Sequence, residues 1–257
     1  MIASFTGDPN FMTSLARGLS VIQAFSQHSP QMSISQVSVR TGISRAAVRR
    51  CLYTLTKLGF VGAEDGRRFS LRPRILSLSH SYTSSNSLAH AAQPILDQLS
   101  HLLHESCSVA TLDGDEIVYV ARANVARLMS VDLGVGSRLP AYCTSMGRIF
   151  LAHLLNEELE QYLARVSLQR YTRRTVVSGE KLRLALRNIQ RTGFAMVDQE
   201  LEVGLRSLAV PVKSATGRVI AAMNVGAQAQ RMPLHEIHGR FLPQLQAAAH
   251  ELSLTLR

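Results

Sequence analysis

The segment from Ser33 to Leu58, SISQVSVRTGISRAAVRRCLYTLTKL, constrains the fold of this chain more than any other. Its apolar residues at three- and four-residue spacing predict a helix with one buried stripe, formed by Val48, Cys51, Leu52, Leu55 and Leu58. Ser44 precedes this helix where an N-cap belongs, and Gly42 lies in the preceding turn, where a positive φ is needed. The pattern predicts two short helices joined by a tight turn, a helix-turn-helix.

The outward face of the second helix has the chemistry of a DNA-reading surface. The buried stripe leaves five polar side chains facing outward, namely Arg45, Arg49, Arg50, Tyr53 and Lys57. Arginine binds guanine and phosphate, and a recognition helix presents its N-terminal residues to the major groove. The DNA contacts predicted here are Ser44, Arg45, Ala46, Arg49, Arg50 and Tyr53. The alternative, an amphipathic helix with merely solvated arginines, does not explain why cap, turn, arginine face and wing follow in the order that docking requires.

A β-hairpin is predicted directly after this helix. Phe60-Val61 and residues 68–71 flank Asp65-Gly66, a dipeptide typical of two-residue hairpin turns. Arg67 and Arg68 stand beside the turn, so we predict that they contact phosphates or the minor groove. The module is therefore expected to be a winged helix-turn-helix.

An earlier helix completes the core of this module. Ser14 is predicted to cap it, and its apolar face is formed by Leu15, Leu19, Ile22 and Phe25. We expect this face to be buried against the helix-turn-helix.

Charge is distributed unevenly along the 257 residues, which have a formal net charge of +10. Residues 1–86 hold 10 basic and 3 acidic side chains, whereas residues 87–257 hold 18 and 15. A polyanionic partner is therefore expected to bind the first third of the chain. The chain shows no apolar run of about 20 residues and no signal pattern, so we expect a cytoplasmic protein without a membrane partner.

The remainder of the chain predicts a second domain of the α+β class with an antiparallel sheet. A short helix follows Pro73 and is expected to end in the serine-rich run 81–87, a linker signal. Strand-like segments joined by short turns follow, among them residues 108–112, 116–121 and 127–133, and a closing amphipathic helix is predicted over 233–256.

No pattern in the sequence indicates a metal, a cofactor or catalysis. Cys51, Cys107 and Cys143 lie far apart without a CxxC pair, so neither a disulfide framework nor a zinc site is indicated. Two helical histidine pairs, at 101/104 and 235/238, supply only two ligands each. The motifs of phosphate loops, dinucleotide folds and nucleophile elbows are absent. We predict no cofactor and no enzymatic activity.

The acidic run from Asp198 to Glu202 has two interpretations. Two carboxylates could serve acid–base catalysis, but no companion nucleophile is apparent. We prefer a structural role, in which Arg206 pairs with this run and fixes the shape of the loop.

Four long blocks carry a resemblance to a known family: SLARGLSVIQAF (14–25), SRAAVRRCLYTLTKLGF (44–60), LPAYCTSMGRIFLA (139–152) and VDQELEVGLRSLAVPV (197–212). On these blocks the chain resembles the IclR family of bacterial transcriptional regulators from about Thr13 to the C-terminus. Within the family it is most similar to regulators of aromatic-acid catabolism through the β-ketoadipate pathway, the protocatechuate and 4-hydroxybenzoate type.

The resemblance implies a winged helix-turn-helix, a linker helix and a GAF-like effector domain with an antiparallel sheet, assembled as a dimer or a dimer of dimers. The expected division is a flexible arm over 1–12, the DNA-binding domain over 13–71, the linker helix over 72–86 and the effector-binding and oligomerisation domain over 87–257.

The resemblance also implies an effector pocket against the concave face of the sheet. Carried over position by position, its contacts are Ser145, Met146, Val197, Asp198, Ser207 and Asn224. A helix beginning at Ser145 would offer N–H groups to an anion, with Arg148 in its first turn. From the residues alone, we would prefer that Thr144 or Ser145 simply caps this helix. The resemblance favours the anion site.

Three classes of function remain open at this point. The leading one is a regulator that binds double-stranded operator DNA and a small anionic effector, aromatic or dicarboxylic, with RNA polymerase as a further candidate partner. The second is an enzyme with a DNA-binding appendage. The third is an architectural DNA-binding protein whose second domain only oligomerises. The sequence does not identify the effector, the operator or the sign of regulation.

Overall fold

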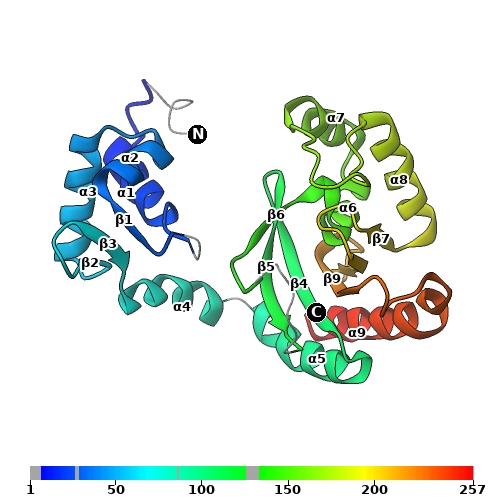
Figure 1. Ribbon diagram of the computed structural model, residues 1–257. Helices are drawn as coiled ribbons and strands as arrows, with labels where there is room; N and C mark the ends of the chain where they lie inside the picture. Colours follow the sequence, from blue (N-terminus) through cyan, green and yellow to red (C-terminus); the bar gives the residue numbers. More distant parts are fainter. Residues whose placement is uncertain (1–6, 27–28, 86, 126–132, 257) are drawn as a thin grey trace. The chain divides into compact units, whose positions relative to one another are not determined.

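The computed structural model describes residues 7–26, 29–85, 87–125 and 133–256 of the chain (Figure 1). Contacts between residues divide the chain into two compact units, residues 1–83 and 84–257. Each unit has its own hydrophobic core, and each is described here by itself.

The first unit is a three-helix module with a small antiparallel sheet. Its elements are α1 (Thr13–Gln23), β1 (Gln31–Ser33), α2 (Ile34–Thr41), α3 (Arg45–Lys57), β2 (Val61–Ala63) and β3 (Arg68–Leu71). The strand order is β1-β3-β2, and both pairs are antiparallel. The predicted winged helix-turn-helix is confirmed.

Local chemistry explains the turn between α2 and α3. The Ser33 side chain and Gln36 form a capping box that starts α2. Gly42 ends α2 with φ of 70°, in the left-handed region that glycine adopts without steric cost. The Ser44 hydroxyl accepts a hydrogen bond from the Ala47 N–H at 3.4 Å, so Ser44 is the N-cap of α3 as predicted.

In two helices, the residues that are buried differ from those that the sequence predicted to be buried. In α3, Val48, Leu52 and Leu55 are buried, but Cys51 is only half-buried and Leu58 is exposed. In α1 the predicted core residues Leu15 and Leu19 are 57% and 49% exposed, and the buried residue is Val21. Ser14 does not cap α1, because the N-cap position is Met12. The reason is that α1 and α3 bury the flanks that face each other and leave an apolar groove beside the contact.

The wing is built by β2 and β3, with residues 64–67 as a four-residue loop in place of the predicted two-residue turn. The Asp65 carboxylate accepts hydrogen bonds from the N–H groups of Arg67 at 2.9 Å and Arg68 at 2.7 Å. These bonds stabilise a longer loop than the dipeptide alone suggests.

The segment expected to form the linker helix, residues 72–86, contains a 3₁₀ turn over Pro73–Ile75 followed by α4 (Leu76–Ser85), so the helix extends into the serine-rich run 81–87 and ends there. Serine and threonine lower helix propensity only moderately, which allows a helix already under way to continue.

The second unit is an α+β domain around a six-stranded sheet. Its helices are α5 (Ser87–Leu103), α6 (Ser145–Ala152), α7 (Asn156–Arg165), α8 (Gly179–Thr192) and α9 (Leu242–Thr255). Its strands are β4 (Ser106–Asp113), β5 (Glu116–Ala123), β6 (Arg138–Pro140), β7 (Ala195–Asp198), β8 (Leu205–Lys213) and β9 (Val219–Gln228). All neighbours in the order β6-β5-β4-β9-β8-β7 are antiparallel, which confirms the predicted class.

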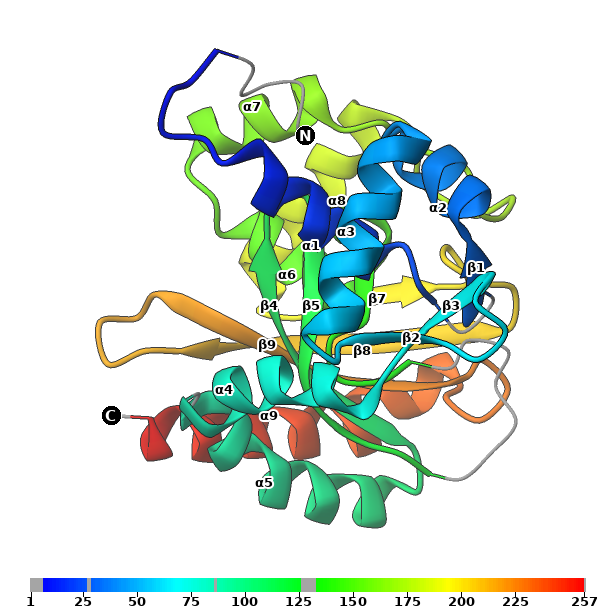
Figure 2. The same ribbon diagram turned by 90° about the vertical axis from the view of Figure 1, so that its left-hand side faces the viewer.

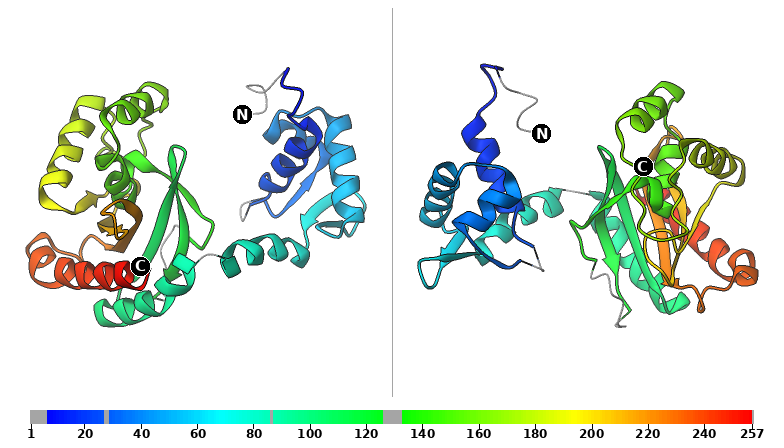
Figure 3. Two further views of the ribbon diagram at one scale, coloured as in Figure 1. Left: turned by 180° about the vertical axis from the view of Figure 1, so that it is seen from behind. Right: turned by 45° about the horizontal axis from the view of Figure 1, so that its top comes forward.

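Helices cover both faces of this sheet. On one face α5 and α9 pack side by side over β4, β5 and β8 (Figures 2 and 3). On the other face α6 lies against β8 and β9, and α8 packs behind it. Residues 126–132, where a strand was predicted, lie outside the described residues. The predicted closing helix has three parts, a 3₁₀ turn, a π-helical turn over Ile237–Phe241 and α9.

A bulge in β5 sets which of its side chains face α6. Tyr119 pairs with Ala110, whereas Ala121 pairs with Val109, so Val120 is an extra residue. Beyond the bulge, the alternation of faces is shifted by one position. Arg122 therefore shares the face of Tyr119, three residues earlier.

Within the described ranges, none of the helices is long and apolar enough to cross a bilayer.

Candidate functional site: a basic helix face and a cavity

The outward face of α3 is basic. Ser44, Arg45, Ala46, Arg49 and Arg50 are all exposed. Tyr53 is 64% exposed, and the Lys57 ammonium lies 5.5 Å from the centre of its ring. No acidic side chain of the described residues forms an ion pair with these arginines. This face can therefore offer its positive charge to a polyanion.

The wing adds two further exposed arginines, Arg67 and Arg68. The hydrogen bonds from their N–H groups hold the pKa of Asp65 below its usual range, so this carboxylate stays ionised while it shapes the loop.

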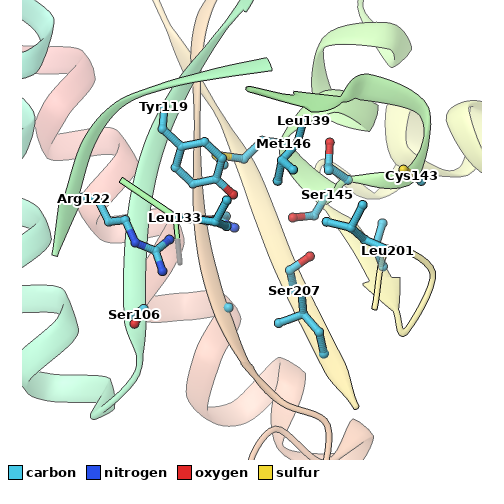
Figure 4. A pocket seen from close by; sticks show the side chains of 15 residues that line it. Ser106, Tyr119, Arg122, Leu133, Leu139, Cys143, Ser145, Met146, Leu201 and Ser207 are labelled. Carbon is cyan, nitrogen blue, oxygen red and sulfur yellow. The ribbon is translucent and has the colours of Figure 1, made fainter. Parts of the chain in front are cut away.

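The second unit contains a cavity between the sheet and the start of α6, with about 610 Å³ of space between atoms, part of it open to solvent (Figure 4). Its described lining combines polar and apolar side chains from both walls, namely Ser106, Tyr119, Arg122, Leu133, Leu139, Cys143, Thr144, Ser145, Met146, Val197, Leu201, Leu205, Ser207, Asn224 and Gly226.

Two cross-strand rows form the floor of this cavity. One row pairs Val197 with Ser207, Ser207 with Gly226 and Gly226 with Ser106, across β7, β8, β9 and β4. The next row pairs Asn224 with Ser108 and Ser108 with Arg122, across β9, β4 and β5. Directly opposed residues point to the same face of a sheet, so the rows gather polar groups on an otherwise apolar face.

Two buried oxygen atoms at this cavity have no hydrogen-bond partner among the described residues. They are the Ser145 Oγ and the Asn224 Oδ1, in side chains that are 1% and 7% exposed. Leaving a buried polar atom unsatisfied costs about 1–3 kcal/mol. The cavity therefore presents hydrogen-bonding groups that a bound molecule could satisfy.

The start of α6 is fixed by Thr144 and not by Ser145. The Thr144 hydroxyl accepts a hydrogen bond from the Gly147 N–H at 3.2 Å and donates to the Pro140 carbonyl at 3.0 Å. The sequence allowed either Thr144 or Ser145 as the N-cap, and the structure shows that it is Thr144. The Ser145 hydroxyl is therefore not used as a cap and is available at the cavity.

Arg148 does not contribute to the cavity, contrary to expectation. Its Nη2 lies 2.7 Å from the Glu200 Oε2, with both side chains more than nine-tenths buried, and its Nε donates to the Tyr142 carbonyl at 2.8 Å. Glu200 also accepts a hydrogen bond from the Val176 N–H at 2.9 Å. The arginine points back into the core because buried charge requires a partner. Through Glu200, Arg148 connects α6 to the segments that contain Glu200 and Val176.

Asp198 also differs from its predicted role as an effector contact. Alternation along β7 places Val197 at the cavity and Asp198 on the opposite face. There the Asp198 carboxylate accepts a hydrogen bond from the Arg206 Nε at 2.8 Å and pairs with Arg174. The structural pairing of Arg206 with the acidic run is confirmed, whereas a contact from Asp198 to the cavity is wrong.

The other predicted contacts come together. Ser145, Met146, Val197, Ser207 and Asn224 all line the cavity, although they come from α6 and three different strands. Sequence reasoning missed the wall formed by β4 and β5, including Tyr119 and Arg122. An arginine within the apolar run of residues 117–123 was the available signal.

One side chain supplies the charge in the described part of the cavity lining. It is Arg122, the only charged residue among the described lining residues. Burial raises the pKa of Tyr119 to about 12 and that of Cys143 to about 12, so both are neutral near pH 7. Among the described residues, no three histidine, cysteine or acidic side chains gather as metal ligands. The arrangement suits an organic anion.

Comparisons with known proteins agree with both units. The IclR helix-turn-helix domain matches residues 14–65, and the C-terminal domain of IclR bacterial transcriptional regulators matches residues 80–254. The Pca regulon regulatory protein of Pseudomonas putida is 54% identical over 252 residues, which cover 98% of this chain and 86% of that protein.

Solved structures agree as well. A transcriptional regulator from Rhodococcus sp. RHA1 is similar with a TM-score of 0.84 and 45% identity, over 96% of this chain and 98% of that one. The inducer-binding domain of the Acinetobacter transcription factor PobR, a double mutant in complex with 3-hydroxybenzoic acid, is also similar. Its TM-score is 0.62 and its identity 30%, over 65% of this chain and 98% of that chain.

These relatives are regulators of transcription and not enzymes, and the two matched domains span most of the sequence. The winged module, the six-stranded domain and the cavity between sheet and α6 are thus features of a DNA-binding regulator, and the chain belongs to the IclR family of bacterial transcriptional regulators.

Proposed function

We propose that this regulator controls genes of aromatic-acid catabolism and that its effector is a small organic acid bound in the cavity between α6 and the sheet. The observation that carries the proposal is the pair of buried oxygen atoms, on Ser145 and Asn224, that face the cavity without a partner among the described residues. A protein that used this domain only to oligomerise would gain nothing from leaving them unsatisfied.

The lining selects the class of effector. Apolar contact from Met146, Val197 and Leu201 suits a ring or a short carbon chain, and polar groups at both walls suit its substituents. Support also comes from two relatives, the Pca regulon regulator and the PobR domain in complex with 3-hydroxybenzoic acid. We therefore assign an aromatic or dicarboxylic acid to this site.

We assign operator DNA to the first unit. In this proposal Ser44, Arg45, Ala46, Arg49, Arg50 and Tyr53 of α3 lie in the major groove, and Arg67 and Arg68 of the wing contact the backbone or the minor groove. Operator DNA is in the cytoplasm of a bacterium, and we place the regulator there. The effector acts by binding one arrangement of the DNA-binding units better than another, since only differential affinity can shift such an equilibrium.

Thermal unfolding of the full chain with protocatechuate, 4-hydroxybenzoate, β-ketoadipate and adipate tests the effector. At least one of these acids should raise the melting temperature, because a ligand that binds only the folded state stabilises it. If none of them does so at millimolar concentration, the proposed class of effector is wrong.

Gly226→Val tests the location of the site. Gly226 lies in the middle of the cavity floor, and a Cβ added there meets no atom within 4 Å. Valine should therefore fold without strain but fill the floor and remove the ligand-dependent shift. The matched control is Gln228→Val, at the exposed end of the same strand, which should respond like the wild type. An unchanged shift in Gly226→Val would place the effector elsewhere.

A further inference from the structure

We propose that Tyr119 of β5 binds the effector directly, by donating a hydrogen bond from its hydroxyl to the carboxylate of the bound acid. The inference deepens the proposed function of the cavity and rests on it. It gives the wall formed by β5 a contact with the anion, and it leaves the oxygens of Ser145 and Asn224 for the remaining polar groups of the ligand.

The backbone of Tyr119 is held on both sides. Its carbonyl accepts a hydrogen bond from the Gly136 N–H at 2.8 Å, and its N–H donates to the Ser137 carbonyl at 3.0 Å. On the other side Tyr119 pairs with Ala110 of β4, and Ala110 pairs with Ala222 of β9. Both alanines are fully buried, and their methyl groups leave space for a large ring in the same cross-strand row. The sheet therefore fixes where the ring starts before any ligand binds.

The hydroxyl of this tyrosine reaches the cavity without a partner. Tyr119 is 4% exposed and lines the cavity, and its hydroxyl forms no hydrogen bond with the residues that the structure describes. Buried tyrosine hydroxyls usually do have a partner. Figure 4 shows the ring entering the cavity from β5, with the hydroxyl directed toward the side on which Ser145 and Leu201 lie. A bound ligand can supply the acceptor that this hydroxyl lacks.

The protonation state of Tyr119 makes its hydroxyl a donor, and a carboxylate is the acceptor that suits it. Burial raises the pKa of Tyr119 to about 12, so the hydroxyl keeps its proton near pH 7. Protocatechuate, 4-hydroxybenzoate, β-ketoadipate and adipate all contain a carboxylate, and a hydrogen bond to an ionised acceptor is about twice as strong as a neutral one. The described lining contains no acidic side chain that could accept this hydrogen bond in place of the ligand.

Tyr119→Phe tests the assignment, because it keeps the buried ring and removes only the hydroxyl. Calorimetry on the full chain measures the affinity for the same four acids. Each acid that binds the wild type should bind the variant about tenfold to a hundredfold more weakly, the loss expected for a hydrogen bond to a charged group. The ligand-free variant should melt at the wild-type temperature or above it, because the removed hydroxyl has no partner among the described residues.

Tyr162→Phe is the matched control. Tyr162 of α7 is 1% exposed, and its buried hydroxyl also has no partner among the described residues, but it does not line the cavity. This variant loses the same group from the same unit and should bind the acids with wild-type affinity. The comparison separates the loss of a buried hydroxyl from the loss of a contact with the ligand.

Three results would reject the contact while leaving the proposed function intact. Wild-type or tighter binding by Tyr119→Phe would mean that the hydroxyl does not donate to the acid. A lower melting temperature of the ligand-free variant, or its failure to fold, would mean that the hydroxyl has a structural role. An equal loss of affinity in Tyr162→Phe would mean that the effect is not specific to the cavity. If none of the four acids binds the wild type, the proposed function itself fails, and this inference fails with it.

Discussion

Arg148 and Arg183 both pair with a glutamate, at 2.7 Å and 2.6 Å, but in opposite surroundings. Arg148 and Glu200 are more than nine-tenths buried under the cavity, whereas Arg183 and Glu160 lie on the surface between α8 and α7. Solvent screens the surface pair, while removing one member of a buried pair leaves an isolated charge in the core. Two ion pairs of similar length therefore differ in what they contribute to stability.

We expect Arg148→Met to destabilise the protein by about 3–5 kcal/mol, because Glu200 would be left buried without its cation. Chemical denaturation monitored by circular dichroism measures this loss. Arg183→Met is the control and should shift the transition little, since its pair is exposed. Equal effects of the two variants would mean that the burial of the Arg148 pair has no energetic consequence.

At the scale of elements, α3 and the wing present arginines in different ways. The arginines of α3 begin at its first residue, Arg45, directly after the cap at Ser44, and this end of the helix can be inserted into the major groove. Those of the wing lie at a loop whose shape is held by Asp65. The first arrangement is suited to reading base edges, and the second to contacts with phosphates.

We therefore expect different losses from the double variants Arg45→Ala/Arg49→Ala and Arg67→Ala/Arg68→Ala. The α3 variant should lose sequence discrimination, at about 1–3 kcal/mol for each bidentate arginine–guanine pair. The wing variant should keep discrimination but flatten the log–log salt dependence by about 0.9 for each phosphate that is no longer neutralised. Competition binding at several salt concentrations measures both, and each variant is the control for the other. If both change only the salt dependence, α3 does not read bases.

At the scale of the whole molecule, the first unit has an apolar groove between α1 and α3. Leu15 and Leu19 of α1 and Leu58 after α3 are 57%, 49% and 49% exposed, and they line one groove with the half-buried Cys51. Helix-turn-helix proteins commonly read two half-sites as symmetric dimers. We therefore predict that a second copy of the chain packs against this groove.

Leu19→Glu should lower the mass observed by analytical ultracentrifugation, because a charge in the groove opposes the burial of apolar surface between copies. The control is Val39→Glu. Val39 is 84% exposed on α2 and does not line the groove, so this variant should keep the wild-type mass. An unchanged mass for Leu19→Glu would remove the groove from the interface.

Local patterns in the sequence were enough to determine the helix-turn-helix formed by α2 and α3. The cap at Ser44, the turn at Gly42 and the period of α3 all depend on residues within a few positions of one another. The resemblance to a family was needed for the cavity contacts Ser145, Met146, Val197, Ser207 and Asn224, because no local rule brings α6 and three strands together.

Only the tertiary structure decided which neighbouring side chains enter the cavity. Strand alternation placed Val197 inside and Asp198 outside, and burial turned Arg148 toward Glu200. The bulge at Val120 shifted the faces of β5 and brought Arg122 beside Tyr119. Each of these outcomes depends on the register between strands that are distant in the sequence. A shift of one residue in that register exchanges the two faces of a strand, and local propensity does not determine it.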